Sequence, residues 1–519
     1  MTAPLETDLA IIGSGFGGSL LAMVARRLGL QVVLLERGAH PRFAIGESAS
    51  PLAGVVIEQL AHRYDLPRLA PLAAYGPWRR HYPHVTCGLK RGFTYYKHQD
   101  GQRFVARADR RNELLVAASP GDEVSDTHWL RADVDQFLMQ EAVSLGADYL
   151  DQLVLDAVVW RDTAATLSGT RRGVPHRIRA RFVVDASGPR GFLNRVLGLD
   201  AGGFAGYPGT QALYSHFTGV HRVEEMGIAP SGEAPPYPPD DAALHHVFDG
   251  GWIWVLRFDN GIVSAGVAAE PWLAEELGLS EGEPAWHRLL DRLPTVRAQF
   301  DGAKPVTPFI HRETLPFRGR VAAGEGWLLL PSAAAFVDPI LSTGFPLTLL
   351  GLERLASALE RSWGTPALAG ELARDAAASL AEADTAALLV AALYSRFDEF
   401  PAFADLTRLY FAAASYAEAA RRLGRPELAG AFLSGDNPRF APGLRECCAL
   451  ALSGADARIL EHRIREVVAP FDLIGLGDTS RRNWYPVLAE DLLLAREKLG
   501  ATREEIESLL ASLMPASVR

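Results

Sequence analysis

The chain has 519 residues, of which 48% are hydrophobic and 22% are charged, and its formal net charge is −10. A chain of this length can bury a large core, and the length suggests two to four structural units. The composition is that of an ordinary soluble globular protein. The acidic balance argues against a nucleic-acid-binding protein, which would usually present a basic face.

Cysteine usage and the N-terminal residues bear on the cellular compartment. The 3 cysteines make no disulfide framework, since Cys447 and Cys448 are adjacent and neighbouring residues cannot easily form a disulfide. Cys87 has no companion at metal-ligand spacing, so no metal site is predicted. The first residues lack the basic region of a signal peptide, and no stretch is apolar and long enough to cross a bilayer. We predict a cytoplasmic protein without membrane insertion.

Residues 7–37 are predicted to form a strand, a glycine-rich turn, a helix and a second strand. Apolar residues fill positions 9–12 and 32–35, and the glycine-rich run of residues 13–18 lies between them, ahead of a helical segment. A βαβ unit of this kind requires a parallel pair of strands and a right-handed crossover. We therefore expect an α/β fold.

The middle of the chain changes character several times. Residues 40–130 are rich in Pro, Gly, Tyr and His and are predicted to be irregular, whereas residues 131–144 have helical periodicity. Short strands are predicted over residues 147–185. The stretch 205–270 alternates aromatic and β-branched residues, which predicts an antiparallel sheet.

The last third of the chain is predicted to be mostly helical. A strand at residues 327–330 leads through a loop to a helix that begins near Phe345. From about residue 366 the chain is rich in Ala, Leu and Glu with a period of 3.6 residues, most clearly over 371–396 and 486–512.

The glycine-rich turn predicts a dinucleotide site. Its first glycine turns the chain, its second lets the backbone approach a pyrophosphate, and its third allows close packing of the helix. The start of the helix offers free backbone N–H groups, and an acidic residue at the end of the next strand accepts hydrogen bonds from ribose hydroxyls. The predicted contacts are Gly13, Gly15, Phe16, Gly18, Glu36 and Arg37.

Two later segments favour FAD over an exchanging NAD. Residues 181–188 form a strand that ends in Asp185 and Gly188, and residues 325–344, which include Asp338, supply a third segment that would reach the same cofactor. Three separated contacts suit a long FAD that stays bound. The arrangement resembles the large group that contains the aromatic hydroxylases and the flavin-dependent halogenases.

Two features of the chain bear on how the flavin would be held. Arg131 opens the helix that contains Asp135 and matches the arginine that this group places beside the flavin; a surface arginine at a helix start is the alternative. The group usually carries Gly-Asp before the small residues of the third segment, whereas residues 331–334 here read Pro-Ser-Ala-Ala. A ribityl contact is therefore missing or altered, and FAD would bind weakly or enter as a reduced, diffusible cofactor.

A double-tryptophan motif separates the halogenases from the hydroxylases. Residues 251–256 read Gly-Trp-Ile-Trp-Val-Leu and resemble this motif, although its usual ending Ile-Pro is here Leu256-Arg257. The resemblance places Trp252 and Trp254 near the flavin, where they would suppress oxygenation of the substrate. Their spacing fits two aromatic core residues on one face of a strand equally well.

Residues 338–344, which we call the halide segment, resemble the part of the family that binds halide beside the flavin. A turn that presents the N–H groups of Thr343 and Gly344 ahead of a helix can hold an anion. The alternative is an ordinary helix entry with Ser342 or Thr343 as its cap.

Lys90 indicates the chemistry most directly. Residues 87–93 read Cys-Gly-Leu-Lys-Arg-Gly-Phe and resemble the corresponding stretch of the phenolic halogenases of the phloroglucinol type. The resemblance makes Lys90 the amine between flavin and substrate that receives hypohalous acid and passes on the halogen. Partial burial would lower the pKa of this amine toward reactivity. Lys97 is the fallback candidate.

Other stretches support the same subgroup. Residues 46–48, Gly-Glu-Ser, and residues 432–437 are similar to it, and Ser48 is counted among the cofactor-binding residues. Tryptophan halogenases carry a glutamate immediately before the Ser-Thr-Gly of the halide segment, where this chain has Leu341. The resemblance therefore favours a substrate that is already activated, such as a phenol or a pyrrole, over an indole.

The resemblance implies a two-component halogenase. A separate flavin reductase would supply reduced FAD, which with O2 and chloride or bromide gives the hypohalous acid that Lys90 presents to a small aromatic substrate, free or bound to a carrier. Glu47 and His84 are candidates for the base that accepts the ring proton. The alternatives are a flavin monooxygenase that oxygenates the ring and a flavin reductase of the isoprenoid type.

The expected architecture follows. Residues 1–365 form a Rossmann-type FAD-binding core of the aromatic-hydroxylase and halogenase kind, with an interleaved antiparallel-sheet substrate lobe at about 70–130 and 205–320. Residues 366–519 form a mostly helical C-terminal region, whose surface could pair two copies of the chain as a homodimer.

Overall fold

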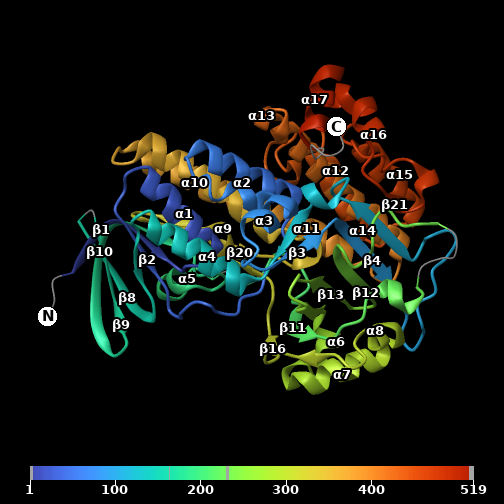
Figure 1. The fold of residues 1–519 in the computed structure, drawn as a ribbon, viewed down its shortest axis with the longest axis horizontal. Helices are drawn as coiled ribbons and strands as arrows, with labels where there is room; N and C mark the ends of the chain where they lie inside the picture. The colour runs from blue at the N-terminus through green and yellow to red at the C-terminus, as the bar shows by residue number, and fades with distance from the viewer. Residues whose placement is uncertain (1–3, 163, 201, 229–232, 514–519) are drawn as a thin grey trace.

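The computed structural model describes residues 4–162, 164–200, 202–228 and 233–513. Its first sheet contains the predicted βαβ unit, which is confirmed as β1 (Leu5–Ile12), α1 (Phe16–Arg27) and β2 (Val32–Leu35) (Figure 1). Residues 9–12 and all of β2 are buried, which is typical of a parallel sheet covered on both faces.

The parallel part of this first sheet sets the position of the nucleotide site. Its strand order is β18-β19-β10-β1-β2-β7, and β19, β10, β1, β2 and β7 run parallel to one another. The further strands are β7 (Asp148–Leu150), β10 (Val174–Asp185), β18 (Ala323–Gly324) and β19 (Trp327–Leu329), with the hairpin β8 (Leu153–Arg161) and β9 (Ala164–Arg171) attached to β10. Ile12 lies opposite both Leu35 and Asp185, so the carboxyl ends of three strands meet at one edge.

The second sheet is mixed. Its order is β15-β11-β14-β13-β12-β4-β5-β21, with β16 beside β11. The strands are β4 (Gly92–Lys97), β5 (Glu113–Ala117), β11 (Gln211–Thr218), β12 (Ala243–Phe248), β13 (Gly251–Arg257), β14 (Val263–Ala269), β15 (Lys304–Pro305), β16 (Ile310–Arg312) and β21 (Trp484–Tyr485). The predicted antiparallel strands of residues 205–270 are confirmed, but β12 also pairs in parallel with β4.

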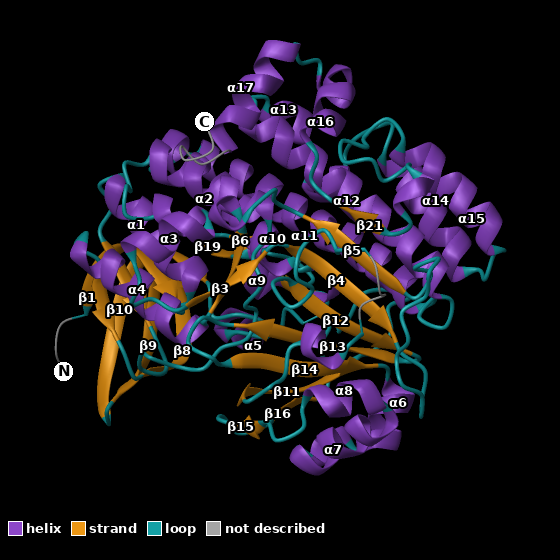
Figure 2. Ribbon diagram, turned by 45° about the vertical axis from the view of Figure 1, so that its right-hand side comes forward, coloured by secondary structure: helices purple, strands orange, loops and turns teal. Residues whose placement is uncertain are grey.

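Each face of the second sheet has its own core. Along β13, Ile253 and Val255 belong to the core that includes Trp286 of α7, whereas Trp252 and Trp254 belong to the main core. Helices α6 (Pro271–Leu277), α7 (Glu283–Arg292) and α8 (Pro294–Gln299) lie on the first side, and the long helices α11 (Ala367–Tyr394) and α12 (Phe400–Arg422) lie on the second (Figure 2). The alternation follows from the two-residue period of a strand.

The prediction of irregular backbone over residues 40–130 is wrong. This stretch contains α2 (Pro51–Arg63), α3 (Tyr75–His81), β3 (Cys87–Lys90) and β6 (Asp126–Trp129), besides β4 and β5. Strands β3 and β6 form a separate two-stranded antiparallel sheet. Strands of four residues are too short to show a hydrophobic period, and their pairing partner lies more than thirty residues away, so the sequence pattern did not reveal them.

The predicted helices are confirmed elsewhere. Helix α4 (Arg131–Ser144) and helix α10 (Gly344–Ser362) both pack on α1. The C-terminal region contains α13 (Pro426–Ala429), α14 (Ala441–Leu452), α15 (Ala457–Val468), α16 (Ala489–Ala495) and α17 (Arg503–Leu513), and it adds β21 to the second sheet.

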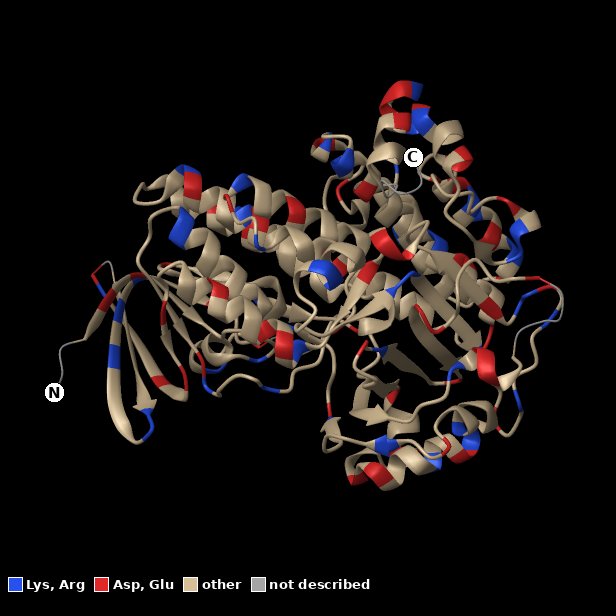
Figure 3. Ribbon diagram, in the orientation of Figure 1, with Lys and Arg blue, Asp and Glu red and all other residues tan. Residues whose placement is uncertain are grey.

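Charge and hydropathy are distributed without a strong bias. Acidic and basic residues are interspersed along the ribbon in the view of Figure 3. The prediction that no stretch is apolar and long enough to cross a bilayer is wrong: among the described residues, α11 is long and apolar enough by length and composition, although 67% of its most apolar 18 residues is buried inside the protein. Burial of that degree is also what a core helix of a globular protein shows.

Candidate active site

The turn between β1 and α1 is shaped for close approach. Gly13 has φ +102, and a Cβ there would lie 2.7 Å from the carbonyl oxygen of Ala186; a Cβ on Gly18 would overlap the carbonyl oxygen of Gly13. Both positions therefore require glycine. The predicted roles of the first and third glycines in turning the chain and packing α1 agree with this geometry.

Glu36 faces the same turn. Its Oε2 accepts hydrogen bonds from the backbone N–H of Ser14 at 3.2 Å and the Ser14 hydroxyl at 2.9 Å, and its Oε1 accepts from the N–H of Gly38 at 2.8 Å. Burial by itself would raise the pKa of Glu36, but Arg42 and these hydrogen bonds outweigh it and lower the pKa below its ordinary value. The carboxylate is thus held ionised, as an acceptor for ribose hydroxyls would be. Arg37 beside it is exposed.

Two arginines meet at the start of α1. Arg131 binds Asp135 through two hydrogen bonds of 2.9 Å and donates to the carbonyl oxygens of residues 45 and 46. Arg42 lies 3.7 Å from Asp135, which also accepts from the N–H of Phe16 at 3.1 Å. A Cβ on Gly15 would lie 3.4 Å from each guanidinium. The sequence predicted Arg131 but missed Arg42, because nothing in its local pattern marks it.

Asp185, the acidic residue at the end of β10, accepts hydrogen bonds from the protein's own backbone. Asp185 is fully buried, accepts from the N–H of Ser187 at 2.9 Å and from the N–H of Leu193 at 2.7 Å, and burial raises its pKa. It thus fixes the loop before α5 (Phe192–Leu197). Gly188 in that loop has φ +85, and no described atom lies within 4 Å of the position that its Cβ would take.

The halide segment ends in an open helix start. The Asp338 carboxylate accepts from the N–H of Ile340 at 2.9 Å and caps the short turn 339–341, and Ser342 follows with φ 51. Helix α10 then begins at Gly344, which is exposed, and no described atom lies within 4 Å of where its Cβ would be. Open space therefore lies beside Gly344 at the start of α10, where the first backbone N–H groups of a helix favour an anion.

The starts of α1 and α10 lie together. Phe16 is the first residue of α1 and Phe345 the second residue of α10; their rings are stacked with centroids 4.6 Å apart, and Trp129 packs edge-on against both. Two helix N-termini thus converge on one region, where their partial positive charges favour an anion. This convergence joins the nucleotide turn to the halide segment.

Lys90 is completely buried beside the halide segment. Its Nζ donates to the carbonyl oxygen of Ala49 at 2.5 Å and to Ser342 Oγ at 3.3 Å, and it lies 4.0 Å from the centroid of the Phe93 ring. Ser342 Oγ in turn donates to Ser48 Oγ at 3.1 Å. Burial lowers the pKa of Lys90 to about 7, although Asp126 opposes the shift. The predicted amine, the halide segment and the 46–48 stretch therefore meet at one point.

The fallback lysine lies elsewhere. Lys97 pairs with Asp249 and donates to the carbonyl oxygen of Phe397 at 2.5 Å, and neither partner belongs to the halide segment. Lys90 is held in its place by backbone packing, since a Cβ on Gly88 would overlap the carbonyl oxygen of Arg257 at the end of β13. The glycine in the 87–93 stretch thus lets β3 cross the end of the double-tryptophan strand.

The double-tryptophan strand is joined to the halide segment. Trp252 is fully buried and donates from Nε1 to Tyr394 OH at 3.0 Å, and Tyr394 OH donates to Asp338 Oδ2 at 2.8 Å. Trp254 packs 5.7 Å from Trp252 and donates to Ser264 Oγ at 3.3 Å. Both tryptophans are core residues, and the first also orients the halide segment through Tyr394, which the sequence pattern did not single out.

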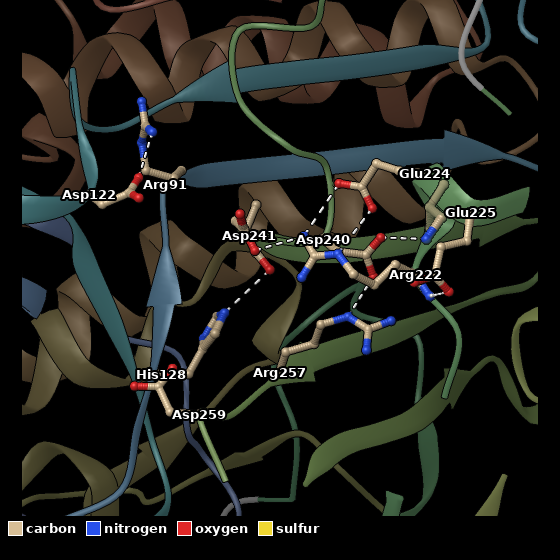
Figure 4. Close-up of polar contacts among 12 residues, drawn as sticks. Arg91, Asp122, His128, Arg222, Glu224, Glu225, Asp240, Asp241, Arg257 and Asp259 are labelled. Carbon is tan, nitrogen blue, oxygen red and sulfur yellow. Dashed lines mark hydrogen bonds and ion pairs between the residues drawn. The ribbon is translucent and has the colours of Figure 1, made fainter. Parts of the chain in front are cut away.

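The unusual ending of that strand has a structural explanation. Arg257 donates to the buried carboxylate of Asp240 at 2.6 Å and to the carbonyl oxygens of Val220, at 3.0 Å, and His221 (Figure 4). Arg91, directly after Lys90, pairs with Asp122 at 2.7 Å. Arg257, at the position where the motif usually has proline, therefore anchors the end of β13 on the side where β3 crosses it.

The two candidate bases differ sharply. Glu47 is buried, its Oε1 lies 2.8 Å from Nε2 of His216, and its Oε2 has no hydrogen-bond partner among the described residues. His84 is exposed and packs edge-on against Tyr82.

A cavity of about 270 Å³ is bordered by Phe93. It lies between the β4–β5 strands and helices α12, α16 and α17, and apolar side chains make up most of its wall. Its polar lining residues are Ser50, at the start of α2, and Tyr410, Ser415, Glu418 and Arg422 of α12. Phe93 thus contacts the Lys90 amine and also borders the cavity.

The residues present fit a flavin dinucleotide. Gly15 and α1 could hold a pyrophosphate with help from Arg42, Glu36 could take a ribose, and the open space before Gly344 could take the ring system. The missing aspartate of the third segment is replaced by a helical turn, α9 (Pro331–Ala334), and a Cβ on Gly351 of α10 would overlap Pro331. That turn therefore packs on α10.

Comparison with known proteins shows similarity to a nucleotide-binding family and to halogenases. Residues 11–74 match the family described as NAD(P)-binding Rossmann-like domain. The chain is 28% identical to a tetracycline 7-halogenase of Kitasatospora aureofaciens over 97% of its own length and 95% of that protein. It is 27% identical to the monodechloroaminopyrrolnitrin halogenase PrnC of Pseudomonas fluorescens over 68% of its length and 61% of that protein.

Solved structures give the same fold. The crystal structure of the halogenase PltM in complex with phloroglucinol and FAD superposes with a TM-score of 0.82 at 23% identity, covering 92% of this chain and 99% of that one. A structure of the chondrochloren halogenase CndH superposes with a TM-score of 0.56. By sequence and by fold the chain is therefore similar to halogenases, among them flavin-dependent ones.

Proposed function

We propose that the protein is a two-component halogenase that uses reduced FAD, O2 and chloride or bromide to halogenate an electron-rich phenolic ring through Lys90. The observation that carries the proposal is the meeting of Lys90 Nζ with Ser342 of the halide segment at 3.3 Å. A buried amine with its pKa lowered to about 7 is the residue type that the chemistry requires at that place.

The cofactor would be held by the groups described above. Gly13, Gly15, Phe16 and Gly18 would take the pyrophosphate with Arg42 and Arg131, and Glu36 and Arg37 the ribose, while Ser48, Asp185, Gly188 and Asp338 would shape the rest of the site. When bound and reduced, FAD would supply hypohalous acid from O2 and halide. The halide would bind at the N–H groups of Thr343 and Gly344, where the partial charge of the α10 start favours an anion.

Lys90 would control the halogen. As a free amine it can attack hypohalous acid, forming an N–halogen bond while the O–halogen bond breaks and water leaves with the amine proton; as an ammonium it can hold hypohalous acid by hydrogen bonding. Its complete burial keeps bulk water from the reactive species. Trp252 and Trp254 would limit access of the substrate to the flavin.

A phenol suits the cavity. Apolar walls would bind the ring, and the polar groups of α12 could receive its hydroxyl. Leu341 is fully buried where tryptophan halogenases carry a glutamate, so a ring activated by its own hydroxyl is favoured. PltM, whose structure contains phloroglucinol, offers a precedent of that class.

The ring proton would pass to Glu47. Its Oε2 is buried and has no hydrogen-bond partner among the described residues, and His216 stands beside its other oxygen to take part in proton transfer. The exposed position of His84 makes that residue the weaker candidate.

The expected partners follow from the chemistry. A separate flavin reductase would deliver reduced FAD by diffusion, and the substrate would be a small aromatic, free or attached to a carrier. The helical C-terminal region remains the proposed surface for a homodimer. The cytoplasm remains the proposed compartment, supported by Cys87, Cys447 and Cys448, which are all free thiols.

Product analysis tests the proposal. Protein would be incubated with FAD, NADH, a flavin reductase, O2, bromide and a panel of resorcinols and phloroglucinol, and products would be read by mass spectrometry. The proposal predicts a product with the two-peak bromine isotope pattern that requires bromide, reductase and O2. An oxygenated product without halogen would instead identify a monooxygenase, and a reduced product that forms without O2 or bromide would identify a reductase.

A further inference from the structure

Lys90 faces a buried carboxylate across the β3–β6 sheet. Register pairs Lys90 directly with Asp126, and directly opposed residues of an antiparallel pair project to the same face. Lys90 is completely buried and Asp126 is 7% exposed. The Oδ2 atom of Asp126 is buried and has no hydrogen-bond partner among the described residues. An unpartnered buried carboxylate oxygen is costly unless it holds or exchanges a proton.

We propose that Asp126 is the electrostatic partner of Lys90, and that its carboxylate decides whether Lys90 is neutral or charged when it meets the halogenating species. The two side chains form no direct ion pair, so Asp126 acts through its charge across the β3–β6 sheet. Asp126 is a positioning residue in this account, since it acts on the reaction through Lys90. The consequence for halogenation rests on the proposed function.

The other groups around the pair cannot easily take this role. Burial, helped by the charge of Lys90, lowers the pKa of His128 on β6 and of His245 on β12 to about 3. Both imidazoles are therefore neutral near neutral pH. On α12, burial raises the pKa of Tyr410, so this phenol stays protonated. Glu418 and Arg422 on the same helix are paired with each other at 2.8 Å.

The pKa values of the two residues shift toward each other. Burial raises the pKa of Asp126 and lowers that of Lys90, while their mutual attraction opposes both shifts. The charged pair and the neutral pair are therefore close in free energy near neutral pH, and the two residues titrate as one coupled system. Removal of the carboxylate leaves burial alone to act on the amine, which lowers its pKa further.

The test measures protonation directly, without flavin or halide. The chain has only four lysines, Lys90, Lys97, Lys304 and Lys498, so protein labelled with 13C and 15N in lysine gives few side-chain amine signals to follow by NMR over a pH titration. The Lys90→Ala variant assigns the Lys90 signal. In Asp126→Asn we expect the Lys90 midpoint to fall by about one pH unit or more. The Asp126→Glu variant should restore most of the wild-type value.

Asp122→Asn is the matched control. Asp122 is an exposed carboxylate that pairs with Arg91, the neighbour of Lys90 in sequence, but it lies outside the buried pair. Its loss should leave the Lys90 midpoint unchanged. An unchanged midpoint in Asp126→Asn, or an equal shift in Asp122→Asn, would overturn the proposal.

A second measurement does not depend on the variant folding. In wild-type protein labelled at the carboxyl carbon of aspartate, the Asp126 signal should titrate together with Lys90; ionisation of Asp126 alone near pH 4, as an ordinary aspartate, would overturn the proposal. In the halogenation assay, the acidic limb of the pH–rate profile of Asp126→Asn should move to lower pH by the NMR shift, whereas a merely structural defect would lower the rate equally at all pH. The NMR titrations use no flavin and therefore test the role of Asp126 separately from halogenation. They can contradict that role while the protein halogenates its substrate, and they can support it when no halogenated product forms.

Discussion

At the residue scale, the chain Trp252–Tyr394–Asp338 links two motifs that lie far apart in the sequence. Tyr394 OH is the middle member, receiving from Trp252 Nε1 at 3.0 Å and donating to Asp338 at 2.8 Å. Burial raises the pKa of Asp338 to about 7, and the hydrogen bonds from Ile340 and Tyr394 offset part of that cost. The position of the halide segment therefore depends in part on this phenol, beside Tyr95 OH, which donates to the Ile340 carbonyl oxygen at 3.0 Å.

Tyr394→Phe should weaken both stability and halide use. Removal of the hydroxyl leaves Trp252 Nε1 and Asp338 Oδ2 without their partner, which should lower the free energy of unfolding by about 1–3 kcal/mol. The looser turn should raise the KM for bromide several-fold. Denaturant titration and bromide-dependent kinetics measure the two effects. Tyr416→Phe, which loses a bond to the Lys498 carbonyl on another part of the fold, should leave the bromide KM unchanged. Equal bromide KM values in both variants would contradict the link.

Gly344 allows stability and function to be separated. A Cβ there would enter open space at the start of α10, so Gly344→Ala should fold normally and gain up to about 1 kcal/mol in helix propensity. The added methyl group would occupy the space assigned to halide, so halogenation should fall by at least about tenfold.

Gly370→Ala is the control for that change. Gly370 is an exposed glycine of α11, and it should gain similar stability without loss of activity. Thermal unfolding and product yield are the measurements. Full activity in Gly344→Ala would show that halide does not bind at this turn.

The residues that sequence reasoning identified are those whose role is local. The glycine turn, Glu36 and Lys90 stand in short stretches whose spacing carries meaning, so their positions could be predicted. Asp126 and Tyr394 were missed because each acts on a residue far away in the chain, through strand register or through packing of a long helix. No local pattern marks such a residue.

At the scale of elements, the same division holds. The βαβ unit, α4 and the helical tail have long periodic patterns and were predicted correctly. Strands β3 and β6 were missed because they are four residues long and pair only with each other. Yet this small sheet carries Lys90, and the crossing of β3 over the end of β13 brings that residue to the halide segment.

Because α12 borders the cavity, we expect its side chains to determine which ring substrates fit. Ala414 borders the cavity and lies on the same helix as Tyr410 and Arg422. Ala414→Phe should fill much of the space and lower kcat/KM for ring substrates by at least about tenfold, while Ala414→Ser keeps the size and most of the activity. Oxidation of reduced flavin by O2 should be unchanged in both. Unchanged kcat/KM in Ala414→Phe would place substrate binding elsewhere.

At the scale of the whole molecule, buried histidines tie stability to pH. Burial lowers the pKa of His245 to about 3, so the folded protein leaves it neutral while the unfolded chain protonates it below about pH 6.5. The unfolded state therefore binds more protons, and stability falls as pH drops from about 6.5 toward 3.

His245→Phe tests this dependence. The ring of His245 stacks on Tyr95 at 4.4 Å, an arrangement that phenylalanine can keep, although the hydrogen bond to the Thr94 carbonyl is lost. The free energy of unfolding of the variant should change less steeply between pH 6 and 5, by up to about 1.4 kcal/mol per pH unit for one proton. Denaturant titrations at several pH values give the slopes. Parallel slopes for wild type and variant would show that His245 is protonated in the folded state.

The central claim is that Lys90 transfers the halogen, and the most direct measurement compares Lys90→Ala with Lys97→Ala. Both variants remove an amine that is largely shielded from solvent, but Lys97 pairs with Asp249 away from the halide segment. Brominated product would be quantified by mass spectrometry per mole of reduced flavin oxidised. The account predicts that Lys90→Ala consumes reduced flavin but forms at least about a hundredfold less brominated product, while Lys97→Ala matches wild type. Bromination by Lys90→Ala at the wild-type yield would contradict it.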